Sequence, residues 1–224
     1  MRNIIFIFTL IIITACQNQK TDFRIEKFET FFGKDNSELL SKKVVSFEKF
    51  LKINFEDLNL EEAYLGYLNI IESGEFEKSH WKYGGTGYDE INQLIEKSEL
   101  RREIWLRPDT VWIENGDIHY EYIYIDNKDT SFIKGNTLSP KYDLIENQDS
   151  IINIEKQLST FNLNGRFIRG LELIKDSDST LISYIDDKHA ATNIAPTIIA
   201  GGLLYHKADF SDYFIKRIVA IELY

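Results

Sequence analysis

PDTVWIENGDIHYEYIYID, residues 108–126, is the stretch where the apolar pattern changes from a period of about 3.6 residues to a period of 2. Asn115-Gly116 at its centre is a strong signal for a β-hairpin, because both residues tolerate positive φ in a two-residue turn. We therefore expect two antiparallel strands joined at this turn. The facing pairs that a two-residue loop predicts are Ile113–Ile118, Val111–Tyr120 and Trp112–His119.

A third strand extends this hairpin. Residues 126–129 provide a second turn, and residues 130–133 alternate again in the manner of a strand. The middle of the chain is therefore expected to form a small antiparallel hairpin or meander.

Before this meander the apolar residues recur at helical spacing. We expect a helix capped by Asn36 or Ser37, a second that begins at Asn59 and a third near Tyr88. Asn59 and Glu62 have the spacing of a capping box. The predicted inner faces contain Val44, Phe47, Phe50, Leu51, Tyr64, Tyr67, Leu68, Ile71, Ile91, Leu94 and Ile95.

Helical spacing returns after residue 149. Asn193 is a candidate cap for a helix with Pro196 in its first turn, and this segment is apolar nearly all round, which places it in the core. Residues 214–224 fit a strand or a helix equally well. The predicted stripes are Ile151, Ile154, Leu158 and Phe161; Phe167, Ile168, Leu171 and Ile174; Leu181, Ile182 and Ile185; and Ile198, Ile199, Leu203 and Leu204. The fold class is α+β, mainly helical with the small sheet in the middle.

The first sixteen residues have the layout of a secretory signal. A short positive start, Met1-Arg2-Asn3, precedes an almost unbroken apolar run over 4–13 and then small residues before Cys16. The apolar run is too short for a spanning helix, which needs about 20 residues. Cys16 is the only cysteine of the chain, so an internal disulfide is excluded.

This layout resembles the signal peptide and lipobox of bacterial lipoproteins. The resemblance implies a signal peptide over 1–15, acylation of Cys16, palmitate included, a tether over 16–24 and a single globular domain over 25–224. Gln17, where aspartate commonly retains lipoproteins at the inner membrane, implies sorting to the outer membrane of a Gram-negative cell. Residue usage also resembles uncharacterised envelope lipoproteins of Bacteroidota. The face of the membrane stays open.

The charge of the chain excludes one class of partner. Loss of residues 1–15 leaves 224 − 15 = 209 residues, which suits one domain with a substantial core. The formal charge of −10 becomes −11 when Arg2 is removed. Nucleic-acid binding relies on lysine and arginine to neutralise phosphates, so we expect no nucleic-acid partner.

Residues 79–88 are the best candidate for a ligand-binding loop. Glycines 84, 85 and 87 make this segment flexible, and aromatic faces beside a histidine suit a sugar or a peptide. The alternative is that the aromatic side chains fix a long loop to the domain. A phosphate loop is excluded, because the Gly-Lys-Ser/Thr ending that it needs is replaced by Gly87-Tyr88-Asp89 and the acidic residues 89 and 90 would repel an anion. The candidate ligand-binding residues are His80, Trp81, Tyr83 and Tyr88.

No other pattern indicates catalysis or a cofactor. The four histidines at 80, 119, 189 and 206 are scattered and lack the spacing of a zinc site. Residues 176–180 lack the glycine and the glutamate that a calcium loop requires downstream, so a turn that caps the next helix is expected. We predict no catalytic residue, no metal and no cofactor.

These observations favour a lipid-anchored envelope protein that binds a protein or glycan as an accessory module. Two alternatives stay open. One is an envelope hydrolase with its site near residues 79–88, for which His80 and His119 must converge with acids such as Asp89 or Glu121. The other is an inhibitor or immunity-type lipoprotein, whose acidic charge speeds association with a basic toxin.

Overall fold

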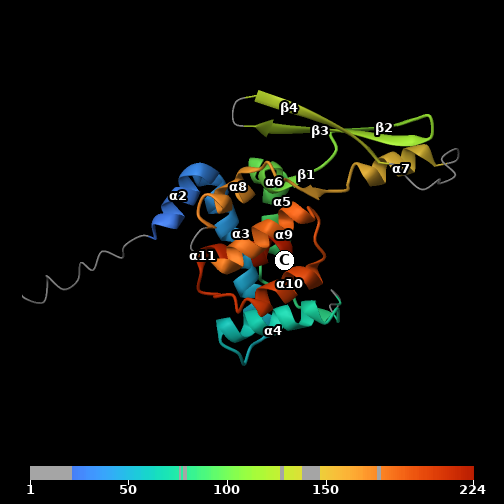
Figure 1. Ribbon diagram of the computed structural model, residues 1–224. Helices are drawn as coiled ribbons and strands as arrows, with labels where there is room; N and C mark the ends of the chain where they lie inside the picture. The colour runs from blue at the N-terminus through green and yellow to red at the C-terminus, as the bar shows by residue number, and fades with distance from the viewer. Residues whose placement is uncertain (1–21, 76, 78–79, 127–128, 138–146, 176–177) are drawn as a thin grey trace, which may run out of the picture.

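The computed structural model describes residues 22–75, 77, 80–126, 129–137, 147–175 and 178–224. The fold is α+β and mainly helical, with small antiparallel sheets, as the sequence predicts (Figure 1). The predicted signal peptide and Cys16 lie outside these residues. The helices are α2 (Phe23–Phe32), α3 (Lys34–Asn54), α4 (Leu60–Glu72), α5 (Tyr88–Glu96), α6 (Glu99–Ile104), α7 (Gln148–Glu155), α8 (Arg166–Glu172), α9 (Ser179–Ala190), α10 (Pro196–Tyr205) and α11 (Tyr213–Glu222).

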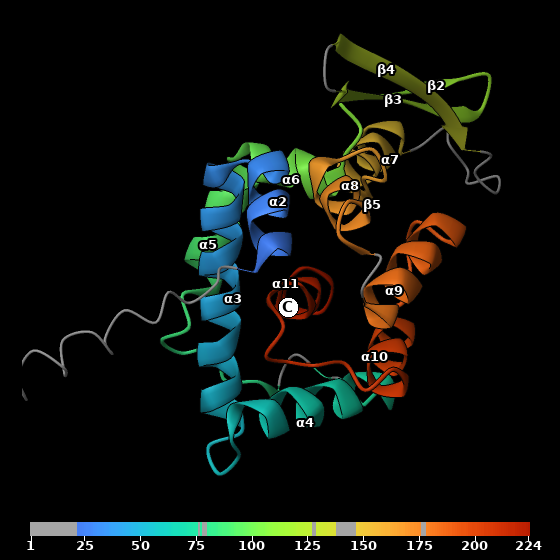
Figure 2. The ribbon, with the colours of Figure 1, turned by 60° about the vertical axis from the view of Figure 1, so that its left-hand side comes forward.

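Helix α3 organises the helical part of the molecule. It packs against α2, α4, α5, α6 and α11, and α10 packs along α4 at the end of α3 that is farther from the sheet (Figure 2). Apolar side chains from these helices form one core. Its largest fully buried members are Tyr64, Tyr67, Phe28, Phe32, Phe47, Phe50, Phe167 and Phe214.

Side-chain caps explain where several helices begin. Asn59 accepts a hydrogen bond from the backbone N–H of Glu62, and the Glu62 carboxylate accepts one from the backbone N–H of Asn59, which confirms the predicted capping box of α4. Asp178 accepts from the N–H groups of the first turn of α9, so the expected capping turn is also present. Asp212 caps α11 in the same way. The last segment is therefore a helix.

The three-stranded sheet has the order β2-β3-β4 and contains β2 (Thr110–Glu114), β3 (Asp117–Asp126) and β4 (Asp129–Thr137). The predicted turn and register are confirmed: Asn115 and Gly116 have φ of 54° and 86°, and Ile113 faces Ile118. Trp112 faces His119, and their rings stack with centroids 5.3 Å apart. The sheet stands at one end of the helical body, with α7 beside it (Figure 1).

A second sheet joins the two helical runs. Strands β1 (Trp105–Leu106) and β5 (Thr160–Phe161) pair antiparallel, with Leu106 opposite Thr160. The chain therefore leaves the helical body after β1, forms β2, β3, β4 and α7, and returns beside its point of departure.

Two predicted caps are wrong. Asn36 and Ser37 lie inside α3 and are buried, while the helix begins at Lys34 after Gly33 with a φ of 94°. Asn193 does not cap α10, whose N-cap is Ala195. Instead its Oδ1 accepts a hydrogen bond of 3.1 Å from the backbone N–H of Phe161. Asn36 likewise bonds away from a cap position, because its Nδ2 donates to the Phe32 carbonyl oxygen at 3.0 Å.

Several predicted inner faces are partly wrong. Phe161 lies in β5 rather than on the predicted helical stripe. Two other members of that stripe, Ile154 in α7 and Leu158 beyond the end of α7, are more than half exposed. Leu94 of α5 is also mostly exposed. Ile198 of α10 is mostly exposed too, so α10 packs one side on the core through Ile199, Ala200 and Leu203 and leaves the other side at the surface. The stripe of α8 is confirmed, with Phe167, Ile168, Leu171 and Ile174 all buried.

None of the helices among the described residues combines the length and the apolar character that a membrane crossing requires.

Candidate functional site

The candidate loop is fastened to the end of α3 by hydrogen bonds. The Asn54 side chain accepts from the backbone N–H of Lys82 at 2.9 Å and donates to the Lys82 carbonyl oxygen at 3.0 Å. Inside the loop, the buried Thr86 hydroxyl donates to the Tyr83 carbonyl at 2.8 Å and accepts from the N–H of Tyr88 at 3.1 Å. The loop therefore has a defined turn that leads directly into α5.

The aromatic residues of this loop are used for packing. The Trp81 ring lies 5.2 Å from Phe50 and 5.6 Å from Tyr67, measured between centroids. Tyr83 lies 5.1 Å from Phe50 and 4.8 Å from Tyr88. Pairs at these separations stabilise a core beyond the area that they bury. The rings attach the loop to the core, as the alternative interpretation of residues 79–88 proposes.

His80 does not join a cluster of catalytic type with His119. Its side chain is 72% exposed, and its Nε2 lies 3.4 Å from the Glu77 carboxylate. His119 lies in β3, which is at the other end of α3 from Phe50 and the loop that packs on it (Figure 2). The structure therefore does not bring these histidines together around Asp89 or Glu121.

A groove of about 330 Å³ lies between α9 and α10. Ser183, Asp187 and His206 are among its lining residues, and these are the residue types of a nucleophilic site. Among the described residues these three side chains form no hydrogen bond with one another. The rest of the lining is largely apolar, from Ile194, Ile198, Ile199 and Leu203.

A buried ionic cluster joins α9 to α11. Lys188 is 2% exposed, and its Nζ lies 3.0 Å from the Glu222 carboxylate and 3.8 Å from the centre of the Phe161 ring. The Tyr184 hydroxyl donates to the same carboxylate. Burial lowers the pKa of Lys188 and, with the charge of Glu222, raises the pKa of Tyr184. Each polar group has a partner, so the cluster fixes the helices relative to each other.

A basic groove lies between α5, α6 and β1, with a volume of about 470 Å³. Arg107 forms a bidentate ion pair with Glu96 across it, at 2.7 and 2.9 Å. Arg101 donates only one long hydrogen bond within the described residues, 3.5 Å to the Trp105 carbonyl. Burial lowers the pKa of Arg101, and the nearby charges of Arg107 and Arg102 lower it further. The lining residues are Asn92, Ile95, Glu96, Arg101, Trp105, Arg107 and Ser159.

Comparisons with protein-family models, curated proteins and solved structures give no match for this chain. Within the described ranges, no group of three or more His, Cys, Asp or Glu side chains is arranged to hold a metal ion.

The sequence reasoning did not identify the basic groove. A signal was present, because residues 101–107 carry three arginines and a tryptophan in a chain with a formal charge of −10. The signal is incomplete, because Asn92 belongs to the preceding helix and Ser159 to a distant segment, and both meet the arginines only through the fold. A charge run alone indicates no more than a solvated face.

Proposed function

We propose that this chain is a lipid-anchored cell-envelope protein that acts by binding a protein or glycan, without catalysis of its own. The observation that carries the proposal is the layout of residues 1–16, which resembles a lipoprotein signal with Cys16 as the acylated residue. Gln17 favours sorting to the outer membrane. Two or more acyl chains give stable attachment, where a single chain is marginal.

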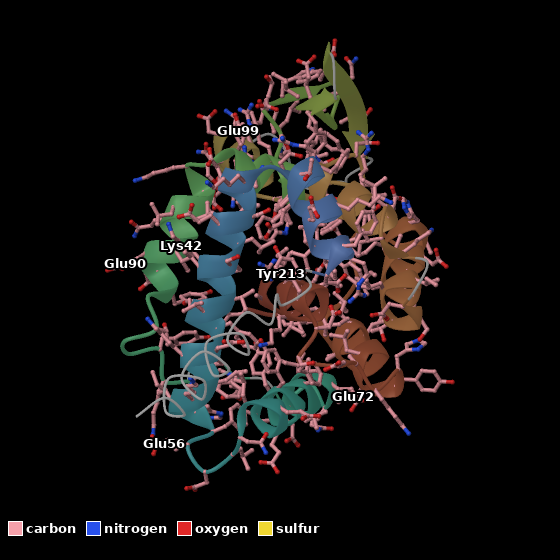
Figure 3. All side chains as sticks on the ribbon, turned by 90° about the vertical axis from the view of Figure 1, so that its left-hand side faces the viewer. Lys42, Glu56, Glu72, Glu90, Glu99 and Tyr213 are labelled. Carbon is pink, nitrogen blue, oxygen red and sulfur yellow. The ribbon has the colours of Figure 1, made fainter. Side chains whose placement is uncertain are left out.

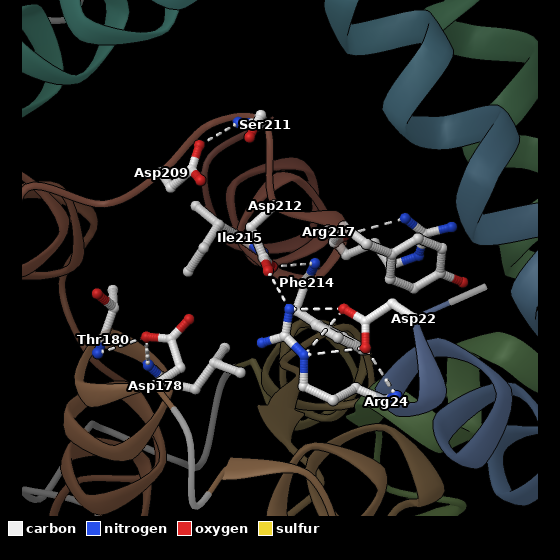
Figure 4. Close-up of polar contacts among 12 residues, drawn as sticks. Asp22, Arg24, Asp178, Thr180, Asp209, Ser211, Asp212, Phe214, Ile215 and Arg217 are labelled. Carbon is white, nitrogen blue, oxygen red and sulfur yellow. Dashed lines mark hydrogen bonds and ion pairs between the residues drawn. The ribbon is translucent and has the colours of Figure 1, made fainter. Parts of the chain in front are cut away.

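The start of the described domain supports a tethered arrangement. Asp22 caps α2, and its carboxylate binds Arg24, which also lies 2.9 Å from the Asp212 carboxylate at the start of α11 (Figure 4). Five residues lie between Cys16 and Asp22, and such a segment spans at most about 20 Å. A lipid on Cys16 therefore holds the starts of α2 and α11 close to the membrane surface.

The outer surface is suited to an aqueous compartment. Charged side chains, including Lys42, Glu56, Glu72, Glu90 and Glu99, point outward around the helical body, while Tyr213, the first residue of α11, lies beside α2 (Figure 3). The Tyr213 hydroxyl donates to the Glu29 carboxylate at 2.6 Å. This surface is compatible with a domain that is attached by lipid and surrounded by water.

The test is a Cys16→Ser substitution in the full-length chain. We expect the wild-type protein to incorporate radiolabelled palmitate and to stay in the carbonate-washed membrane fraction, because the acyl chains provide the attachment. The Cys16→Ser variant should lose the label and leave that fraction, whereas a control Gln19→Ser variant should behave as wild type. Retention of the Cys16→Ser variant in washed membranes contradicts the anchor. Turnover of an envelope polymer by the purified domain contradicts the proposal of binding without catalysis.

A further inference from the structure

The basic groove of α5, α6 and β1 is a concentration of hydrogen-bond donors in an acidic protein. The chain has 36 acidic residues against 26 basic ones. In the groove the proportion is reversed, because Arg101 and Arg107 face a single carboxylate, that of Glu96. A reversal of local charge inside a concave surface indicates an anionic ligand, since such a site concentrates counter-ions.

The one acidic residue of the groove is already engaged. Both Glu96 oxygens accept hydrogen bonds from the Arg107 guanidinium, at 2.7 and 2.9 Å. This bidentate geometry leaves the carboxylate little capacity to repel a second anion. The Arg107 Nε is buried and has no hydrogen-bond partner in the part of the chain that the structure describes.

Arg101 supplies the free positive charge. A guanidinium carries five N–H donors, and the only hydrogen bond that we find for Arg101 among the described residues is the 3.5 Å contact with the Trp105 carbonyl. No described carboxylate lies within ion-pair distance of it. Glu96 and Asp109 act on it only through longer-range electrostatics. The planar fork of Arg101 is therefore available for an oxyanion.

The Asn92 amide is oriented from behind the groove. Lys43 of α3 is 3% exposed, and its Nζ donates to the Asn92 Oδ1 at 3.1 Å. Because the oxygen is engaged by Lys43, the Asn92 amide nitrogen remains as a donor. Among the described residues Lys43 has no carboxylate partner. Its positive charge therefore lies directly behind Asn92, which lines the groove.

The remaining wall is apolar and aromatic. Trp105 and Ile95 line the groove beside the arginines. Trp105 is only partly buried against the core, so part of its indole is accessible. An indole provides a flat apolar surface for a ring or a short hydrocarbon chain. The groove therefore combines one anion-binding region with one apolar region.

We propose that this groove binds a small organic anion, with its oxyanion on Arg101 and Asn92 and its apolar part on Trp105. Carboxylates and phosphate esters share this chemistry, because both accept paired hydrogen bonds from a guanidinium. The inference goes beyond the proposed lipid-anchored function and does not depend on lipidation of Cys16.

The experiment is isothermal titration of the domain, residues 22–224, with benzoate, phenyl phosphate, inorganic phosphate and benzyl alcohol. We expect benzoate or phenyl phosphate to bind more tightly than inorganic phosphate, because only the organic anions contact Trp105, and benzyl alcohol not to bind. The tighter of the two organic probes identifies the anion as a carboxylate or a phosphate ester. Absence of heat with every anion at millimolar concentration overturns the proposal.

Two substitutions locate the site. Arg101→Gln should weaken binding by about ten- to a hundredfold, the effect of losing a charged hydrogen bond. Arg102→Gln removes the same charge from an exposed neighbour on α6 that does not line the groove, so it should bind as wild type. Equal affinity in Arg101→Gln and wild type contradicts the assignment.

A third variant keeps the test decisive if Arg101→Gln fails to fold. Asn92→Asp has nearly the same shape and places a carboxylate beside Lys43, so folding is expected to be retained. The new carboxylate has no N–H group to donate to the oxyanion, so binding should weaken by about tenfold or more. Unchanged binding in Asn92→Asp contradicts the proposal without reference to Arg101.

Discussion

At the scale of single residues, Lys43 is the least expected feature of the fold. The spacing of the apolar residues on α3 does not include it, yet it is 3% exposed and has an amide instead of a carboxylate as its partner. Its Nζ also lies 5.2 Å from the centre of the Tyr224 ring, a cation–π contact. Burial lowers the pKa of Lys43 from 10.5 to about 8.

This lowered pKa predicts a pH dependence of stability. The unfolded chain holds the Lys43 proton up to pH 10.5, whereas the folded chain releases it near pH 8. Folding therefore releases a proton between these values, and the free energy of unfolding rises with pH in that window. The contribution from Lys43 should increase by about 2 kcal/mol between pH 8 and pH 10, since one pKa unit corresponds to about 1.4 kcal/mol.

Urea unfolding of wild type and Lys43→Met at pH 8, 9 and 10 measures this effect. The difference between the two proteins isolates Lys43, because the buried tyrosines and Lys188 are common to both. We expect the wild type to gain stability relative to Lys43→Met over this range. A difference in unfolding free energy that stays constant with pH would show that the amine does not lose its proton in the folded state.

At the scale of elements, the sequence-based predictions were correct wherever a short segment determines its own conformation. The Asn115-Gly116 turn fixed the register of β2 and β3, because its two residues adopt positive φ. The capping box of α4 involves only Asn59 and Glu62, three residues apart. No distant residue is needed for either feature, so the sequence pattern was sufficient.

Where the sequence-based prediction was wrong, contacts with distant residues determine the observed structure. Asn36 and Ser37 are good caps in isolation, but α3 begins earlier, after Gly33. Both residues therefore lie inside the helix, where they are buried. Asn193 bonds to β5, which lies about 30 residues away in the sequence. Apolar residues on α7 and α10 remain exposed, because α7 has no fully buried residue and α10 buries only one side. Periodicity gives the helix but not the face that it buries.

The candidate sites show the same difference between features that depend on local sequence and features that depend on tertiary contacts. The loop over 80–88 was recognised from composition, and the structure places its tryptophan and tyrosines on the core. The basic groove requires the meeting of α5, α6 and the segments that flank the second sheet. A single sequence does not reveal such a meeting.

The cap of α4 provides a test with opposite expected signs in one helix. Asn59→Ala removes the acceptor for the Glu62 N–H and should lower the free energy of unfolding by about 1 kcal/mol. Asn69→Ala changes the same residue type within the same helix, where the exposed side chain donates to the Leu65 carbonyl. Alanine is the better helix former there, so this variant should be unchanged or more stable by about 0.5 kcal/mol. Chemical denaturation measures both, and equal effects would exclude the capping interpretation.

At the scale of the whole molecule, the chain consists of a helical body and an excursion between β1 and β5. The buried side chains of the body form one core, and Leu106, Val111 and Ile118 are buried outside that core. The excursion leaves and returns at a paired position, Leu106 opposite Thr160. The Cα atoms of such a pair are about 5 Å apart, so a short loop can close the body without the sheet.

This architecture predicts that the body folds alone. Replacement of residues 108–158 by Asn-Gly joins Arg107 to Ser159 through a two-residue hairpin turn, which matches the antiparallel pairing of β1 and β5. We expect the shortened domain to keep its helical circular dichroism and a cooperative thermal transition, with a melting temperature lowered by only a few degrees. The reason is that no residue of the main core is removed. The small loss of stability comes from Leu106, which is buried outside that core and becomes more exposed without the sheet.

Removal of residues 193–206 is the contrasting control, since it takes Ile199 and Leu203 from the core and should abolish the transition. A shortened domain without cooperative melting would mean that the sheet and α7 are needed for the body to fold.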